Sequence, residues 1–430
     1  MTAHIDLSAY RRYFPALQRE INGQPVIYWD NPGGTQVAQQ VIEAMTRYLR
    51  EANANAHGTF FTSQRTDEII ATARQAMADF LNAASPAEIV FGPNMTTLTF
   101  AFSRAIGQTL QAGDEIIVTV LDHDANVAPW LALQERGVVI RTVDIHPENV
   151  TLNLQDLQEK INERTRLVAV GYASNAVGTI NDVQRITQLA HAAGALVWID
   201  AVQYAPHGPI DVQALDVDFL VCSAYKFFGP HLGILYGKRQ HLEHFPAYKV
   251  RPASNAVPER WETGTQNHEG VAGLIGAIDY LTLLGEKQAA HYAADPRLCP
   301  YQGRRRSLKV AMQAISDYER QLSAQLLPGL REIKGLRIYG ISGTAPDELA
   351  QRVPTVACTI NGHHPRALAT ALGERGIFAW DGNYYALGLM ERLGLEGRGG
   401  ALRLGLCHYN TPAEIERVLS VLQELAGAGN

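Results

Sequence analysis

Hydrophobic residues in the first two thirds of the chain fall into short runs that alternate with helix-like patterns. Short apolar runs bounded by polar residues are typical of strands buried on both faces of a parallel sheet. Such runs occupy residues 116–120, 138–143, 167–171, 196–199, 219–222 and 234–236. Helical spacing of apolar residues lies before and between them, at 66–81, 98–106, 154–161, 183–190 and 271–284. This alternation predicts βαβ units and an α/β fold.

The pattern changes near residue 290. Residues 292–306 contain two prolines and three consecutive arginines, and they break the periodicity. Beyond them we expect a long helix at 308–327, strands at 336–339 and 355–360, and helices at 365–375 and 414–425. The prediction is therefore a large α/β domain at 31–290 and a smaller α+β domain at 291–430. We expect the segment 1–30 to pack on the smaller domain.

Composition narrows the classes of function. The formal charge of −6 is spread over 430 residues without a basic block, which argues against a nucleic-acid or membrane-surface partner and favours a small soluble substrate. The four cysteines are far apart and form no CxxC pair, so neither a metal site nor a disulfide framework is expected. The first twelve residues lack a signal-like apolar stretch and no run reaches membrane-spanning length, which predicts a cytoplasmic protein.

Two chemically suggestive residues follow apolar strands. Asp200 ends the run VWID, and Lys226 comes 26 residues later, after the run at 219–222 and before a glycine-rich turn. Ligands of α/β proteins bind at the carboxyl ends of strands. Pyridoxal phosphate (PLP) chemistry needs a lysine for an imine, a carboxylate for the pyridine nitrogen, phosphate donors and a flat partner for the ring. Taken singly, Asp200 could be a turn residue and Lys226 a solvated surface residue.

Taken together, the motifs of this chain resemble those of the class V aminotransferase family, most closely its cysteine desulfurase branch. The resemblance covers most of the chain. It rests on IYWDNPGGTQ at 27–36, Asn55 to His57, Asn94 to Thr97, DHDANVAPW at 122–130, Asn175, Asp200, Gln203, Ser223, Lys226, ETGTQN at 262–267 and Arg403 in ALRLG. It implies a PLP-dependent transferase fold of type I, in which the large domain contains a mixed, mostly parallel sheet.

The resemblance also assigns roles around the cofactor. Lys226 would carry PLP as a Schiff base, Asp200 would face the pyridinium nitrogen and His123 would stack on the ring, and these three form the predicted catalytic set. Asn175 and Gln203 would lie near the phenolic oxygen, and both side chains offer donors. Without the motif, His123 would be interpreted as a hydrogen-bonded core or surface histidine.

Phosphate and substrate contacts follow from the same resemblance. Met95 and Thr96 would hold the phosphate at a helix N-terminus together with Ser223, although Thr96 could simply be an N-cap. Thr265 would reach the phosphate of a neighbouring subunit, which implies a homodimer with shared active sites. The alternative for Thr265 is a surface turn. Arg403 would bind the substrate carboxylate through its planar guanidinium, unless it is a surface arginine.

The chain departs from the cysteine desulfurase pattern in one loop. Cysteine desulfurases carry a nucleophilic cysteine there, whereas residues 379–389 read AWDGNYYALGL. Alignment on Gly382 places Tyr385 at the cysteine position and Trp380 at the position of an arginine. Tyr225 also replaces the histidine that precedes the lysine. Cys407, four residues after Arg403, is interpreted as a buried or structural thiol rather than a nucleophile.

The expected function is therefore an enzyme that acts on an α-amino acid through an external aldimine. Transamination or Cα-proton-dependent lyase chemistry is placed first, with Lys226 as base. Trp380, Tyr384 and Tyr385 could form an aromatic wall for the substrate side chain, or they could pack the domain interface. Two alternatives stay open: desulfuration or C–S lysis without an enzyme persulfide, and a catalytically silent PLP-binding protein. No GxxxxGK[ST] or GxGxxG motif follows a strand, which argues against a nucleotide-binding enzyme.

Overall fold

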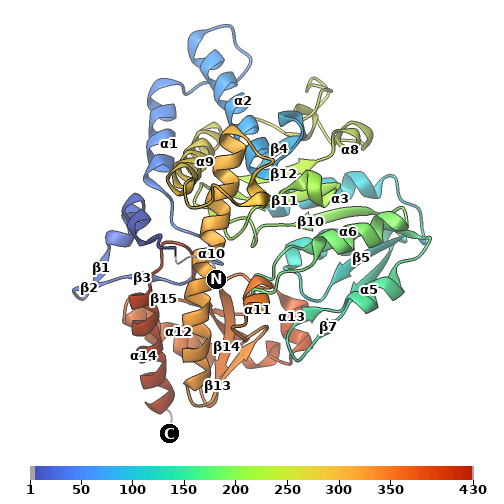
Figure 1. Ribbon diagram of the computed structural model, residues 1–430. Coiled ribbons are helices and arrows are strands. Elements are labelled where there is room, and N and C mark those ends of the chain that lie inside the picture. The colour runs from blue at the N-terminus through green and yellow to red at the C-terminus, as the bar shows by residue number, and fades with distance from the viewer. Residues whose placement is uncertain (1–4, 429–430) are drawn as a thin grey trace.

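A computed structural model describes residues 5–428 of the chain. Its centre is a seven-stranded sheet in the order β4-β12-β11-β10-β9-β5-β6 (Figure 1). The strand bounds in that order are Ile89–Gly92, Gly233–Gly237, Phe219–Ser223, Leu196–Asp200, Thr165–Gly171, Glu115–Thr119 and Val139–Val143. All neighbours from β11 to β6 are parallel, and β12 is antiparallel to both of its neighbours. The predicted mixed, mostly parallel sheet is confirmed.

Both faces of this sheet are covered by helices, as the continuous apolar runs require. Successive strand residues point to opposite faces. Accordingly, Trp198 and Val221 pack with helix α3 (Met95–Gly107), whereas Ile199 and Cys222 belong to the main core on the other face. The helices that contribute to that main core include α2 (Phe61–Leu81), α6 (Val183–Ala192), α9 (His268–Gln288) and α10 (Gly303–Glu332). Helix α1 (Gln39–Glu51) packs along α9.

A second, four-stranded sheet lies below the first in Figure 1. It is antiparallel throughout, in the order β13-β14-β17-β16, with bounds Leu336–Tyr339, Thr355–Ile360, Ala401–Gly405 and Trp380–Gly382. Its helices are α11 (Pro346–Ala350), α12 (Pro365–Glu374), α13 (Leu387–Arg392) and α14 (Pro412–Ala428). The short strand β3 (Ile27–Tyr28) pairs with β15 (Ile377–Phe378).

The remaining elements are short. They are the hairpins β1 (Glu20–Ile21) with β2 (Gln24–Pro25) and β7 (Ile145–His146) with β8 (Thr151–Leu152), and the helices α4 (Ala128–Leu131), α5 (Leu154–Lys160), α7 (Val212–Leu215) and α8 (Arg239–His244). Among residues 5–428, no helix is both long and apolar enough to cross a membrane.

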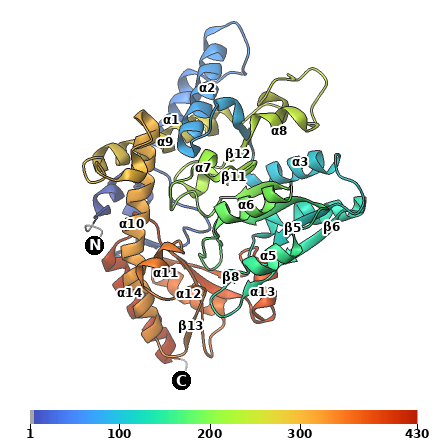
Figure 2. The ribbon, with the colours of Figure 1, turned by 45° about the vertical axis from the view of Figure 1, so that its right-hand side comes forward.

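The long helix α10 differs from its prediction, because it begins at Gly303 rather than at Leu308. Arg304 and Arg305 are therefore helical, and both form ion pairs with Asp79 of α2. The helix then continues along the second sheet, so it joins the two parts of the molecule (Figure 2). A domain boundary near residue 291 stays a prediction, since the helix that follows it packs on both sides.

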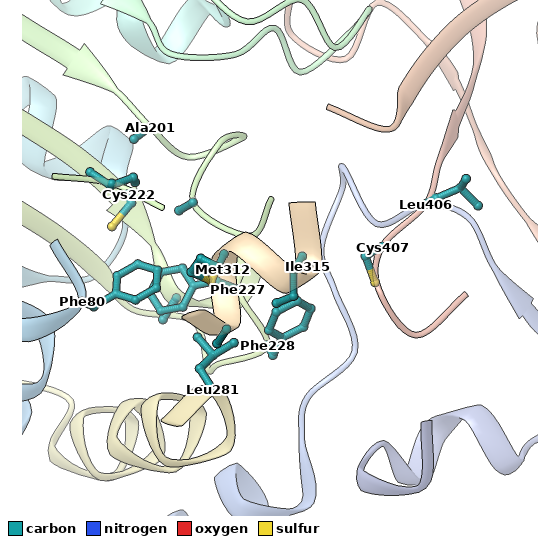
Figure 3. Packing of buried hydrophobic residues seen from close by; sticks show 14 of the residues in the cluster. Phe80, Ala201, Cys222, Phe227, Phe228, Leu281, Met312, Ile315, Leu406 and Cys407 are labelled. Carbon is teal, nitrogen blue, oxygen red and sulfur yellow. The ribbon is translucent and has the colours of Figure 1, made fainter. Parts of the chain in front are cut away.

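The segment after Lys226 is anchored deep in the core. Phe227 stacks on Phe80 with ring centroids 5.1 Å apart, and Phe228 packs edge-on against Tyr280. Figure 3 shows this cluster, with Leu281 beside the two phenylalanines. Both phenylalanines are fully buried. Because close-packed aromatic rings resist displacement, they fix the position of the lysine that precedes them.

Candidate active site

A cavity of about 270 Å³ opens at the carboxyl ends of the central parallel strands. Gly171, Asp200 and Ser223, the last residues of β9, β10 and β11, all line it. The structure brings most of the predicted site residues to this cavity: Met95, Thr96, His123, Asn175, Asp200, Gln203, Ser223, Lys226, Trp380, Tyr385 and Arg403. Thr265 does not line it.

Lys226 lies buried on one wall of the cavity. Its Nζ donates to the backbone oxygens of Pro32 and Gly33, the latter at 3.1 Å. Burial, together with the nearby positive charge of Arg403, lowers the pKa of Lys226 to about 7, although Asp30 and Asp200 oppose the shift. About half of the lysine is therefore a neutral amine at neutral pH, which is the form that attacks a carbonyl carbon.

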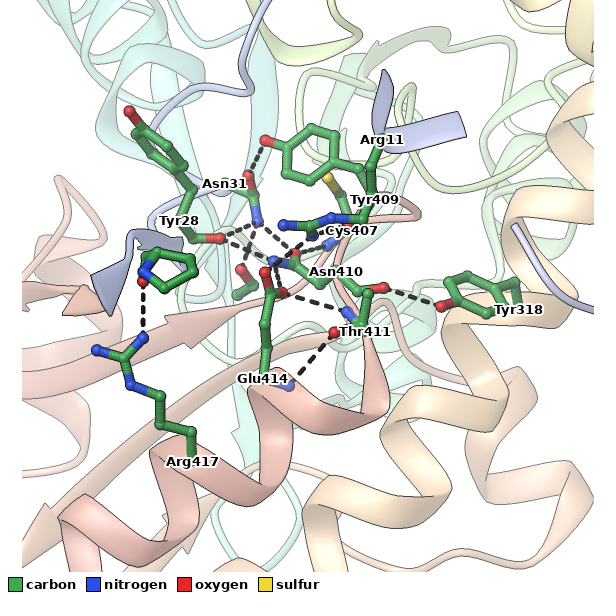
Figure 4. A network of polar contacts seen from close by, with 12 residues as sticks. Arg11, Tyr28, Asn31, Tyr318, Cys407, Tyr409, Asn410, Thr411, Glu414 and Arg417 are labelled. Carbon is green, nitrogen blue, oxygen red and sulfur yellow. Dashed lines mark hydrogen bonds and ion pairs between the residues drawn. The ribbon is translucent and has the colours of Figure 1, made fainter. Parts of the chain in front are cut away.

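The loop that receives Lys226 is itself held by a polar network (Figure 4). Asn31 Nδ2 donates to the backbone oxygen of Gly405 at 2.8 Å and to Asn410 Oδ1 at 3.0 Å. Asn410 Nδ2 in turn donates to Glu414 at the start of α14. Buried and mutually satisfied polar groups of this kind specify one conformation. The residues that contact the lysine are thus fixed from the second sheet.

The pKa of Lys226 gives a testable pH dependence. Imine formation needs the neutral amine, and the neutral fraction rises as the pH passes upward through the pKa. We expect the rate at which cofactor-free protein takes up PLP to rise about tenfold between pH 6 and pH 8, and to level off above that range. Stopped-flow absorbance at constant ionic strength measures this rate. A rate that stays flat until pH 10 would contradict the lowered pKa.

Two buried carboxyl groups lie close to one another at the base of the cavity. Burial raises the pKa of Asp200 to about 6, while the backbone N–H of Val202 and the charge of Lys226 lower it. Burial also raises the pKa of Asp122 to about 7, and the neighbouring charge of Asp200 adds to this shift. Asp122 accepts hydrogen bonds from Thr119 and Asn126. A positively charged group beside Asp200 would stabilise its ionised form.

His123 is a neutral, flat group at the mouth of the cavity. Burial, followed by repulsion from Lys226 and Arg403, lowers its pKa to about 4. Its Nδ1 accepts a hydrogen bond from the backbone N–H of Ala125 at 3.0 Å, so the ring proton is on Nε2. The ring of Tyr385 stacks on it with centroids 5.4 Å apart and an interplanar angle of 26°.

The two amides predicted to act as donors are already used by the protein. Asn175 Nδ2 donates to the backbone oxygen of Tyr384 at 2.8 Å, and Gln203 Nε2 donates to Thr355 Oγ1 at 3.1 Å. The amide oxygens of Asn175 and Gln203 are buried and lack partners. These two oxygens are therefore free hydrogen-bond acceptors, and a hydroxyl or ammonium group of a bound molecule could donate to them.

The N-terminus of α3 forms the opposite end of the cavity. Asn94 is its N-cap, and Asn94 Oδ1 accepts from the N–H of Thr97 at 2.8 Å. The alternative in which Thr96 is the N-cap is therefore wrong. The N–H groups of Met95 and Thr96, in the first turn, are available to an anion, and the helix dipole favours negative charge there.

Arg403 is positioned for a carboxylate by contacts on three sides. Its Nη2 pairs with Asp30 Oδ1 at 3.0 Å, its Nη1 donates to the backbone oxygen of Asn175 at 3.1 Å, and its guanidinium lies 4.4 Å from the centroid of the Tyr384 ring. Its Nε is buried without a partner. The side chain is only 4% exposed, so the alternative of a surface arginine is wrong.

None of the four cysteines lines this cavity. Cys222, Cys358 and Cys407 are buried, and Figure 3 shows Cys222 and Cys407 within the packed core. Burial raises the pKa of the Cys358 thiol to about 12, and it also raises the pKa values of Cys222 and Cys407. Cys299 is exposed and precedes α10. Tyr385, which lines the cavity, is 73% exposed, and its alignment with the cysteine of the desulfurase branch stays a prediction.

Comparison with known proteins agrees with this geometry. The sequence profile described as aminotransferase class-V matches residues 27–297 and 306–418. The chain belongs to the class V aminotransferase family. It is 34% identical over 428 residues to a probable cysteine desulfurase of Synechocystis sp., covering 96% of this chain and 94% of that protein. A cysteine desulfurase of Serratia proteamaculans is also 34% identical, with 96% and 97% covered.

Solved structures show the same architecture. A cysteine desulfurase from Thermococcus onnurineus superposes with a TM-score of 0.85 at 27% identity, covering all of both chains. One from Escherichia coli gives a TM-score of 0.81 at 27% identity, with 99% of each chain covered. The predicted fold of type I is therefore confirmed. The protein is a PLP-dependent enzyme of the class V aminotransferase family.

The cavity of this class V enzyme suits PLP on its own geometry. A buried carboxylate, a neutral flat imidazole, a helix N-terminus and a partly deprotonated lysine surround one space of about 270 Å³. Three residues of the lining also carry a buried polar atom without a hydrogen-bond partner, namely the amide oxygens of Asn175 and Gln203 and the Nε of Arg403. A bound group could form hydrogen bonds with these atoms. The assignment of individual roles to these residues stays a prediction.

Sequence patterns missed several residues of the site. Asp30 holds Arg403, the carbonyls of Pro32 and Gly33 receive Lys226, and Asp122 lies beside Asp200. Tyr384, predicted only as part of an aromatic wall, also lies against Arg403. Asp30 lies within the segment 27–36, so its position in a motif was the available signal. Its partner could not be inferred, because Asp30 and Arg403 are 373 positions apart.

Proposed function

We propose that this enzyme cleaves the C–S bond of L-cysteine or L-cystine and releases the sulfur without a persulfide on its own chain. The curated relatives are named cysteine desulfurases, which favours sulfur removal over the transamination that the sequence placed first. The observation that carries the proposal is the cavity lining, which contains Lys226, Arg403 and no cysteine. An elimination needs no thiol of the enzyme to receive sulfur.

The overall reaction balances without an oxidant. L-Cysteine and water give pyruvate, ammonia and hydrogen sulfide, and L-cystine and water give pyruvate, ammonia and cysteine persulfide. The Cα–H and Cβ–S bonds break, and the sulfur leaves with the electron pair of the Cβ–S bond. When bound, PLP withdraws electrons from the Cα of an attached amino acid, which makes the Cα–H bond acidic.

The residues of the chain divide the remaining tasks. Arg403 binds the substrate carboxylate and fixes the orientation of Cα, since a guanidinium contacts both carboxylate oxygens. The Nζ of Lys226 takes the Cα proton, and its pKa near 7 suits a base that works at neutral pH. Asp200 would hold a proton on the pyridine nitrogen of bound PLP. His123 lines the same cavity, and its Nε2–H would donate to the departing sulfur.

A homodimer with shared active sites is part of this proposal. Thr265 lines a separate cavity of about 290 Å³ together with Trp261 and Tyr248, as a residue that serves a neighbouring subunit would. Large apolar side chains are also exposed: Phe60, Phe61, Tyr248 and Val250 are each more than half exposed. Such side chains are typical of a surface that a partner covers. Sedimentation equilibrium of the purified protein measures the assembly.

The reaction is tested with PLP-loaded protein and L-cysteine, L-cystine or L-alanine. We expect sulfide from cysteine, persulfide from cystine, and pyruvate with ammonia in equal amounts from both. The matched variant is Cys299→Ser, which removes the exposed thiol and should retain full activity, because that thiol is not in the cavity. Colorimetric sulfide assays and enzymatic pyruvate assays give the rates.

Other products would indicate a reaction different from the proposed elimination. A keto acid that keeps its sulfur would indicate transamination. Alanine in place of pyruvate, with sulfur trapped on the Cys299 side chain and loss of activity in Cys299→Ser, would indicate desulfuration through an enzyme persulfide. Mass spectrometry of the intact protein after turnover distinguishes these outcomes from the elimination.

A further inference from the structure

A second cavity, of about 240 Å³, shares a segment of chain with the active site. Residues 171–181 contribute to the Lys226 cavity, and residues 172–184 contribute to the second one; Asn181 lines both. The other walls come from Tyr204 and His207, from one face of α10 between Ser316 and Ser323, and from residues 350–354. The second cavity thus lies against α10, the helix that runs past both sheets in Figures 1 and 2.

Arg352 contributes to one wall of this cavity, which the carboxylates of Asp182 and Glu319 also line. Arg352 is 4% exposed, and its guanidinium donates only to backbone oxygens, those of Ile341, Val353 and Thr355. Within residues 5–428 no carboxylate forms an ion pair with Arg352, and burial alone lowers its pKa to about 10. Arg320, partly exposed, has one long contact of 3.4 Å with Asp317. A buried cation without a counter-ion is costly, so an anionic group would stabilise this wall.

Glu319, the neighbour of Arg320 on α10, contributes an unsatisfied acceptor to the lining of this cavity. Glu319 has a side chain only 2% exposed, and its Oε2 lies 2.8 Å from Nδ1 of His207. Its Oε1 is buried without a hydrogen-bond partner. A buried carboxylate oxygen without a donor costs free energy that a bound ammonium or hydroxyl would recover. Tyr172 and Tyr204, stacked with centroids 3.8 Å apart, provide a flat wall beside it.

We propose that this second cavity binds a free α-amino acid. Its carboxylate would contact Arg320 and Arg352, and its ammonium group would contact Glu319 Oε1. The pairing follows from the charges, because the same small space needs both an anion and a donor, and an α-amino acid carries both groups on one carbon, Cα. The space suits a molecule of that size rather than a nucleotide. The inference does not depend on the reaction proposed above.

Contacts connect this site to the active site. Arg352 Nη2 donates to the backbone oxygen of Thr355 at 2.7 Å, and Thr355 Oγ1 accepts from Gln203 of the Lys226 cavity at 3.1 Å. The backbone also bridges the two parts, since Ile180 N–H donates to the oxygen of Gln351 and Val353 N–H donates to that of Gly178. An amino acid bound between Arg352 and Glu319 is therefore expected to change substrate affinity at the active site.

Binding is tested with the holoenzyme after borohydride reduction, which blocks the chemistry at Lys226. The background variant Arg403→Ala weakens binding in the active site, so L-alanine titrated by calorimetry reports the second site. We expect one site per chain. Adding Arg320→Ala should raise its Kd about tenfold or more, since a charge-assisted contact is lost. Arg331→Ala, an exposed arginine on the same helix, is the matched control and should leave Kd unchanged.

Simple probes test the chemistry of the ligand. Acetate and ethylamine each carry one of the two charged groups, and both should bind at least tenfold more weakly than L-alanine. Acetate binding as tightly as L-alanine would overturn the amino-acid assignment. Absence of a site in the Arg403→Ala background, or an equal Kd with and without Arg320→Ala, would overturn the site itself. None of these results would contradict the proposed release of sulfide from cysteine, which is measured separately.

Discussion

Replacement of Lys226 by alanine is expected to abolish covalent attachment of PLP and to lower kcat about 10³-fold or more. One amine both carries the cofactor and takes the Cα proton, so its removal eliminates two functions. The wild-type protein reduced with borohydride should gain the mass of reduced PLP on the peptide that contains Lys226. The variant should show no such adduct, although the other groups that line the cavity should still bind PLP without a covalent bond.

The chain offers its own control for this experiment. Lys309 is also fully buried, and burial lowers its pKa to about 7 as well. It donates to the backbone oxygens of Phe80 and Ile210 and does not line the Lys226 cavity. A labelled peptide at Lys309, or an undiminished rate in Lys226→Ala, would show that a low lysine pKa alone attracts PLP and would contradict the site.

Replacement of Arg403 by alanine is expected to raise KM for L-cysteine about 100-fold, with a smaller effect on kcat. The guanidinium is held in place by Asp30 and Tyr384 with its Nε free, so the loss removes a preformed carboxylate site rather than a flexible side chain. A charge-assisted contact contributes about 1.5–3 kcal/mol, which corresponds to roughly 10- to 150-fold in affinity. Steady-state kinetics of sulfide release measures both constants.

Two further variants separate binding from structure. Arg403→Lys keeps the charge and loses the planar fork, so it should recover only part of the affinity. Arg392→Ala removes an exposed arginine paired with Asp144 and should leave KM unchanged. If Arg403→Ala lowered kcat and left KM unaltered, the arginine would act on the chemical step and the proposed carboxylate contact would be wrong.

Local patterns account for much of the sheet. Strands β13 and β14 have the predicted bounds, and the other predicted strands agree within two residues. The antiparallel direction of β12 also follows from local information, although the prediction did not specify it. Only the segment from Ala224 to Leu232 connects β11 to β12, and a parallel crossover needs a dozen or more residues. The short strands β4 and β16 were missed, since three or four residues show little periodicity.

Local sequence information is limited in the same way for the active site. The sequence by itself determined that Asp200, Ser223 and Lys226 lie close together, because they end or follow apolar strands and such strands end at one edge of a parallel sheet. Only the tertiary structure decided the contacts between distant segments. Asp30 reaches Arg403 because β3 pairs with β15 and Asp30 bridges to Gly405. The tertiary structure also decided which thiols are buried, and it built the second cavity from four separate segments. Periodicity reports which face of an element is buried, whereas long-range packing selects the partner that covers it.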